Sequence, residues 1–111
     1  PDQAEFVRLA DQVPEHFRFV VKAPRELLEP RAQGFDSQAF IRDFLHPAAR
    51  GMGAKLGIVL LQFPPGAGRA GRLFCRQLGD LLAVLPSDLS YGVEVRDAEL
   101  LGPELQEALQ G

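Results

Sequence analysis

Four polar residues that could carry chemistry stand at or near the ends of three apolar segments: Lys22, Gln62, Glu94 and Arg96. A carboxylate and a guanidinium two residues apart on one strand can orient a polar ligand or support general acid/base catalysis. A lysine can neutralise an anionic substrate or, if it is buried and neutral, act as a base or form a Schiff base. Glu94 and Lys22 are therefore candidate catalytic residues, and Gln62 and Arg96 are candidate ligand-binding residues.

Each candidate also has a purely structural interpretation. Glu94 and Arg96 could form an internal salt bridge, and Lys22 could form a buried ion pair with Glu94, because structural ion-pair networks resemble functional sites. The Gln62 amide could satisfy the backbone of the proline-containing loop that follows it. The residues alone leave these alternatives open.

The segments that carry these residues are expected to be strands. Lys55–Pro65 is an almost wholly apolar run that ends in an amide, an aromatic and two prolines, which indicates a strand buried on both faces. Phe17–Ala23 ends near a lysine, and Tyr91–Arg96 ends in charged residues. Parallel α/β folds place their sites at the C-terminal ends of such strands.

Helical periodicity separates the three expected strands. The first expected helix covers 2–13 with Asp2 as N-cap, and the second is capped by Ser37 and kinked or ended by Pro47. A longer helix runs from about Arg69 to Pro86, and a short one covers Leu101–Leu109. The apolar stripe of the longer helix is Leu73, Phe74, Leu78, Leu81, Leu82 and Leu85. This alternation predicts an α/β protein with parallel βαβ units. Residues 1–111 fit one domain or part of one, and a start at Pro1 rather than Met is expected of a piece of a longer protein.

Strand periodicity predicts that the candidate residues share one face, since residues two apart point to the same side. That face carries Val20, Lys22, Ile58, Leu60, Gln62, Gly92, Glu94 and Arg96, and the other carries Phe17, Phe19, Val21, Val59, Leu61, Phe63, Val93 and Val95. Bulky apolar side chains suit packing against helices. The polar strand ends should therefore point away from the helices, which in a closed barrel means toward the interior.

Charge and composition argue against several classes of partner. A formal net charge of -3 and a pI near 5.3 disfavour nucleic acid, which usually requires a basic surface. Arg69, Arg72 and Arg76 lie on one side of a helix, where a solvated face is the simpler interpretation. No apolar run approaches the roughly 18 residues needed to span a bilayer, so no membrane association and a cytoplasmic location are expected.

No motif identifies a cofactor. His16 and His46 do not group with carboxylates, so no metal site is expected. Gly66 and Gly68 precede a helix without a Walker or dinucleotide fingerprint. Cys75 lies among apolar residues, which indicates a buried thiol on a helix rather than a nucleophile.

Three motifs, in order along the chain, resemble those of the YecE-like family, also called domain of unknown function 72. They are Phe17–Ala23 with its Val-Lys-Ala ending, Lys55–Pro65 of the type Lys-Leu-Gly-x-x-Leu-x-Gln-x-Pro-Pro, and Tyr91–Arg96 of the type Tyr-x-x-Glu-x-Arg. The resemblance implies a TIM-barrel-like fold of about eight βα units, with residues 1–111 as its central part. Where members often carry a Thr-His pair this chain has Leu28-Glu29-Pro30, and where they tend to have a tryptophan it has Glu99-Leu100.

These features predict a partial TIM-barrel-like α/β domain whose strand ends bind a small polar or anionic molecule. Acid/base catalysis is one outcome, and a noncatalytic binding or interaction scaffold is the alternative. Nucleic acid processing is a third hypothesis, although the sequence lacks the metal ligands or basic track that it normally requires. The sequence leaves open whether the protein is an enzyme, its cofactor and its oligomeric state.

Overall fold

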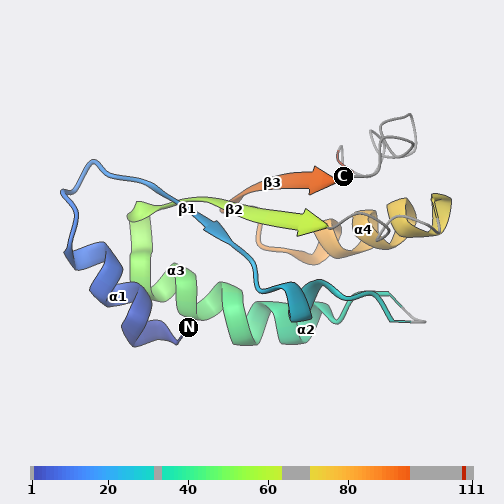
Figure 1. The fold of residues 1–111 in the computed structure, drawn as a ribbon, viewed down its shortest axis with the longest axis horizontal. Helices are drawn as coiled ribbons and strands as arrows, with labels where there is room; N and C mark the ends of the chain where they lie inside the picture. Colours follow the sequence, from blue (N-terminus) through green and yellow to red (C-terminus); the bar gives the residue numbers. More distant parts are fainter. Residues whose placement is uncertain (1, 32–33, 64–70, 96–108, 110–111) are drawn as a thin grey trace.

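Three parallel strands form the sheet of this protein. A computed structural model describes residues 2–31, 34–63, 71–95 and 109. The strands β1 (Phe19–Lys22), β2 (Leu56–Phe63) and β3 (Ser90–Val95) lie in the order β1-β2-β3, so β2 is central and pairs on both edges. All three point the same way, and the described helices lie on one side of them (Figure 1). The predicted alternation of helices with parallel strands is confirmed.

Carboxylate caps begin the first two helices. Helix α1 (Gln3–Asp11) starts after Asp2, whose side chain accepts a hydrogen bond from the Glu5 N–H at 3.1 Å, as predicted. Helix α2 (Ser37–Phe40) is capped by Asp36, which accepts from the Ala39 N–H at 3.0 Å. The prediction that Ser37 is this cap was therefore wrong by one residue. Aspartate fits the position because its charge also complements the positive end of the helix dipole.

Pro47 widens its helix instead of ending it. The π-helical turn Ile41–Leu45 joins α2 to α3 (His46–Met52), and the His46 N–H donates to the Ile41 carbonyl five residues back. A proline lacks an N–H and its ring clashes with the carbonyl four residues earlier. A wider turn just before Pro47 relieves that conflict, so the helix continues to Met52.

The core lies between the sheet and the helices. The fully buried side chains of β2 are Val59, Leu61 and Phe63, all on its helix-facing side. Phe63 packs edge-on against Phe74 of helix α4 (Arg72–Val84), with ring centroids 5.0 Å apart. Such aromatic pairs contribute about 0.5–1.5 kcal/mol beyond the area that they bury.

Most of the apolar stripe predicted for α4 is buried, with Leu73 as the exception. Phe74, Cys75, Leu78 and Leu81 are buried, whereas Leu73, expected in the buried stripe, is 41% exposed. The Phe74 ring packs against the rings of Phe35 and Phe63 in the core. The predicted burial of the Cys75 thiol is confirmed.

The first strand is shorter than predicted. It begins at Phe19, and Phe17 lies outside it with 41% exposure, its ring packed against that of Phe19. The pairing of β1 with β2 shifts register between Phe19 and Val20. A Cβ on Gly57 of β2 would lie 2.9 Å from the Phe19 carbonyl oxygen, so glycine is required for this close approach.

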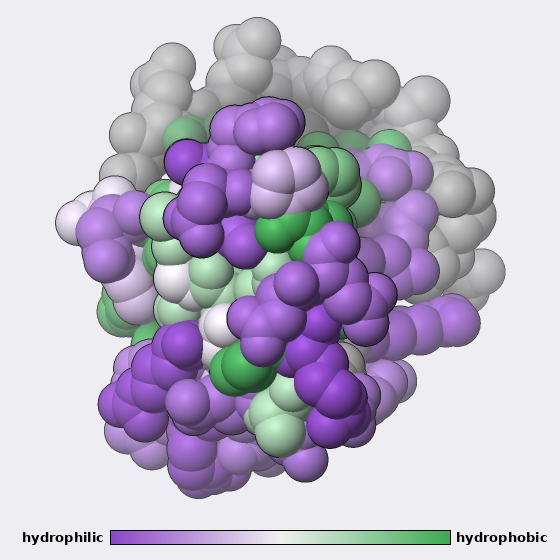
Figure 2. Space-filling view, turned by 90° about the vertical axis from the view of Figure 1, so that its left-hand side faces the viewer, coloured by the Kyte–Doolittle hydropathy of each residue, from purple (hydrophilic) through white to green (hydrophobic). Residues whose placement is uncertain are grey.

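At the end of the molecule opposite the C-terminal ends of the strands, the surface is mainly hydrophilic. Figure 2 shows this end, with smaller hydrophobic areas between hydrophilic ones. Within the described part of the chain, no helix combines the length and apolarity needed to cross a bilayer.

Lys55, the first residue of the Lys-Leu-Gly motif, joins the helical layer to the start of β2. Its Nζ donates hydrogen bonds to the carbonyl oxygens of Ala10 at 2.7 Å and Val13 at 2.9 Å. Carbonyls at the end of a helix lack intrahelical partners and carry the negative end of the helix dipole. A half-buried ammonium group therefore caps α1 from a residue more than 40 positions away.

We expect Lys55→Met to lower the free energy of unfolding by about 1.5–3 kcal/mol, because it removes charge-assisted hydrogen bonds to carbonyls. Denaturant unfolding of the intact protein measures this change. Arg76→Met is the matched control, since Arg76 is exposed on α4 and its loss should change stability by less than about 0.5 kcal/mol. Equal effects of the two substitutions would contradict the capping role.

Gly51 allows α1 and α3 to pack closely. A Cβ at this position would lie 2.5 Å from the Phe6 Cβ and 2.8 Å from the Gln3 carbonyl oxygen. Both distances are too short for real contacts, and the second partner is backbone that cannot rotate away.

We expect Gly51→Ala to destabilise the protein by about 1–3 kcal/mol through overpacking. In an unobstructed helix the same change would stabilise by about 1 kcal/mol, because alanine has the higher helix propensity. Thermal or denaturant unfolding shows whether the substitution lowers or raises the free energy of unfolding. A more stable variant would show that the helices separate without cost.

Candidate functional site

The three strands bring Lys22, Gln62 and Glu94 to one face and one end of the sheet. Gln62 lies directly opposite Glu94 in the register of β2 and β3, and Lys22 lies opposite Leu60, one step before Gln62. Their opposite-face neighbours Val59, Leu61 and Phe63 pack against the helices. The prediction that the polar strand ends point away from the helices is therefore confirmed for these three residues.

A hydrogen bond joins the two strand-end residues of β2 and β3. The Gln62 Nε2 donates to the Glu94 Oε1 at 3.1 Å, and both residues are half-buried. This bond fixes the orientation of the carboxylate.

Lys22 is exposed and stands apart from this pair. Among the residues that the structure describes, its ammonium group has neither a hydrogen bond nor an ion pair. The predicted buried Lys22–Glu94 pair is therefore wrong. Lys22 is on the edge strand β1, and β2 separates it from Glu94. Lys22 also lies two residues before Glu94 in the register, whereas Gln62 lies directly opposite Glu94.

Several expectations fall outside the described residues. They concern Arg96, the loop that includes Pro64, Pro65, Gly66, Gly68 and Arg69, and the helix predicted over Leu101–Leu109 apart from its last residue. Arg72 and Arg76 are exposed on α4. The partner of the Gln62 amide that the structure does show is Glu94, rather than loop backbone.

Metal ligands do not gather in the described part of the chain. No group of three or more His, Cys, Asp or Glu side chains there is arranged to hold an ion. His16 and His46 are both exposed and lie on separate segments.

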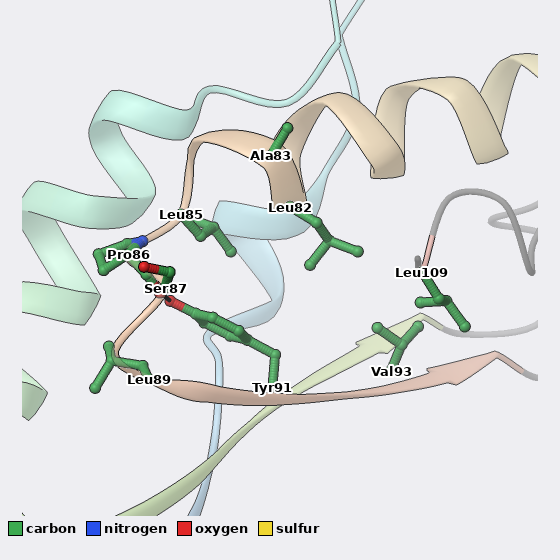
Figure 3. Close-up of a pocket in the computed structure, with 9 residues that line it drawn as sticks. All are labelled: Leu82, Ala83, Leu85, Pro86, Ser87, Leu89, Tyr91, Val93 and Leu109. Atoms are coloured by element: carbon green, nitrogen blue, oxygen red, sulfur yellow. Dashed lines mark hydrogen bonds between the residues drawn. The ribbon is translucent and has the colours of Figure 1, made fainter. Parts of the chain in front are cut away.

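A separate apolar pocket lies on the helix-facing side of the sheet. Its volume is about 320 Å³, and its lining residues are Leu82, Ala83, Leu85, Pro86, Ser87, Leu89, Tyr91, Val93 and Leu109 (Figure 3). It lies between the end of α4 and β3, on the opposite face from Glu94. The Tyr91 hydroxyl donates to the Pro86 carbonyl at 2.8 Å and so ties β3 to the turn before it. No sequence motif predicted this bond.

Comparison of the chain with models of known protein families identifies its family. The family model described as "Protein of unknown function DUF72" matches residues 1–111, so this chain belongs to that family. No curated protein and no solved structure matches the chain. The family resemblance inferred from the three strand motifs is confirmed.

Tyr91 provides a pH-dependent test of the packing around β3. Burial, followed by the nearby Asp88 charge, raises the pKa of Tyr91 to about 12. The folded state thus holds this proton more tightly than the unfolded chain, where the pKa is about 10. The resulting stability is complete below pH 10 and is lost as the pH rises toward 12.

We expect tyrosinate absorbance to titrate near pH 12 in the folded chain and near pH 10 in denaturant. Tyr91 is the single tyrosine of the 111 residues, so the signal is unambiguous in this segment. Tyr91→Phe should flatten the fall in stability above pH 10. A folded-state titration near pH 10 would contradict this packing.

Proposed function

We propose that this protein binds a small polar or anionic molecule at the C-terminal ends of its parallel strands. Lys22 supplies positive charge, the Gln62–Glu94 pair supplies an oriented amide and carboxylate, and Arg96 is a further ligand-binding residue. The observation that carries the proposal is that polar side chains from three different strands lie on the face of the sheet that the described helices leave open. Parallel α/β proteins commonly place sites at this edge.

The proposal includes a TIM-barrel-like whole, of which residues 1–111 form a central part. In such a barrel the helix-free face of this sheet is the interior, and the Lys22–Glu94 end is the catalytic mouth. The support is the parallel strand order and the placement of the described helices on one side. A cytoplasmic location is part of the same proposal.

Glu94 is the proposed general acid/base group. Gln62 orients its carboxylate. Lys22 is the second proposed catalytic residue, which neutralises an anionic substrate or acts as a base or a Schiff-base lysine. The alternative, a noncatalytic binding scaffold, uses the same residues for recognition alone. The site favours a small molecule over nucleic acid because only one described cation, Lys22, lies with Gln62 and Glu94 at this edge.

Mass spectra of the intact protein purified from cells, recorded under native and denaturing conditions, should reveal a small molecule that leaves on denaturation. We expect Lys22→Met to weaken an anionic ligand about 10–100-fold, the value of a charge-assisted hydrogen bond. Arg76→Met, with the same charge change on α4, should leave binding unchanged. A ligand that responds to neither Lys22→Met nor Glu94→Gln would place the site elsewhere.

A turnover assay distinguishes the catalytic site from the noncatalytic binding scaffold. Glu94→Gln removes the ionisable group while keeping the shape of the side chain. In an enzyme this change abolishes turnover and leaves much of the binding intact, whereas in a scaffold the wild-type protein returns its ligand unaltered.

A further inference from the structure

The helix-facing side of β3 is covered less completely than that of the central strand. Val59, Leu61 and Phe63 of β2 are 0%, 0% and 2% exposed, whereas Tyr91 and Val93 of β3 are only half-buried. The apolar pocket of about 320 Å³ lies against these two residues of β3 (Figure 3). An apolar sheet face is normally buried against another layer, so the pocket marks a place where a further apolar element belongs.

The chain itself returns to this pocket after β3. The strand ends at Val95, and Leu109 lines the pocket together with Val93 (Figure 3). Residues 96–108, which connect the two, lie outside the described part of the chain. Leu109 is 48% exposed, so it does not fill the pocket alone. The segment that ends at Leu109 is therefore within reach of the pocket.

The sequence of this segment has the pattern of a short amphipathic helix. Its apolar residues recur at spacings of three and four: Leu101, Leu105, Ala108 and Leu109. Pro103 fits the first turn of such a helix, and Glu107 falls on the side opposite the apolar stripe. Most helical stability in proteins comes from packing of the apolar face, so a helix of this length requires a surface to bury its stripe.

Covalent attachment favours this segment over any other occupant of the pocket. A tethered segment has an effective concentration on the order of millimolar at a surface within its reach. A ligand or a second copy of the chain would have to exceed that advantage in order to displace it. The lining of the pocket, which includes Leu82, Leu89, Tyr91 and Val93, complements leucine side chains.

We infer that residues 101–109 form an amphipathic helix that docks on the apolar pocket, with Leu105 and Leu109 against Tyr91 and Val93. Docking makes the pocket part of the core and holds β3 from its helix-facing side. The inference goes beyond the proposed function and does not depend on it, because the pocket and Glu94 lie on opposite faces of the sheet.

Nuclear Overhauser contacts in the intact wild-type protein give the first test. The Leu105 methyl groups should show contacts to the Tyr91 ring and to the Val93 methyl groups. In a mixture of labelled and unlabelled protein, these contacts should arise within one chain. A dye that fluoresces on exposed apolar surface should not bind the folded wild-type protein at this pocket. This measurement does not depend on a variant that folds.

Two glutamine substitutions give the second test. Leu105→Gln places an amide in the apolar stripe, and we expect loss of the contacts to Tyr91 together with a gain of dye fluorescence. Glu107→Gln is the matched control, because it places the same side chain on the opposite side of the helix and should leave both signals unchanged. The unfolding midpoint of each variant shows that it is folded.

Three results would overturn the inference. One is a wild-type protein that lacks the Leu105 contacts and binds the dye at Tyr91, which would show that the pocket is open. Another is a contact to Tyr91 that arises from a second copy or from a copurified small molecule, which would identify a different occupant. The third is an equal response to Leu105→Gln and Glu107→Gln. None of these results bears on the polar residues of the proposed site.

Discussion

The parallel pairing of β2 with a strand on each side is the constraint on which the rest of the structure depends. It places Val59, Leu61 and Phe63 against the helices and leaves Leu60 and Gln62 on the other face. A slip of one residue would exchange the two sets, exposing a phenylalanine and burying an amide. Burial of each large side chain is worth about 1.5–3 kcal/mol, so the core holds the register, and the register aligns Gln62 with Glu94.

The Lys-Leu-Gly strand motif divides into two parts with different physical roles. Its first three residues are structural: Lys55 caps α1, Leu56 is buried and Gly57 makes room for the Phe19 carbonyl. Its end carries Gln62, which is half-buried and bonded to a carboxylate on the next strand. One continuous segment therefore anchors the helical layer at one end and presents a polar group at the other.

Much of the fold could be predicted because its signals are local. Apolar runs identified the strands, helical periodicity identified α1 and α4, and Asp2 identified one cap. The errors arose where neighbours in space decided the outcome. Leu73 of α4 is exposed although it was predicted to be buried, and Asp36 replaced Ser37 as the cap. Pro47 is accommodated by a wider helical turn that periodicity does not show.

The sequence by itself determined which residues alternate between the two faces, because side-chain direction in a strand follows from backbone geometry with a period of two. It therefore separated Lys22, Gln62 and Glu94 from the core. Only the tertiary structure decided which of them meet. The parallel register places Gln62, rather than Lys22, beside Glu94, and it brings Lys55 to the end of α1. Contacts between distant segments depend on how whole elements pack, which no single segment encodes.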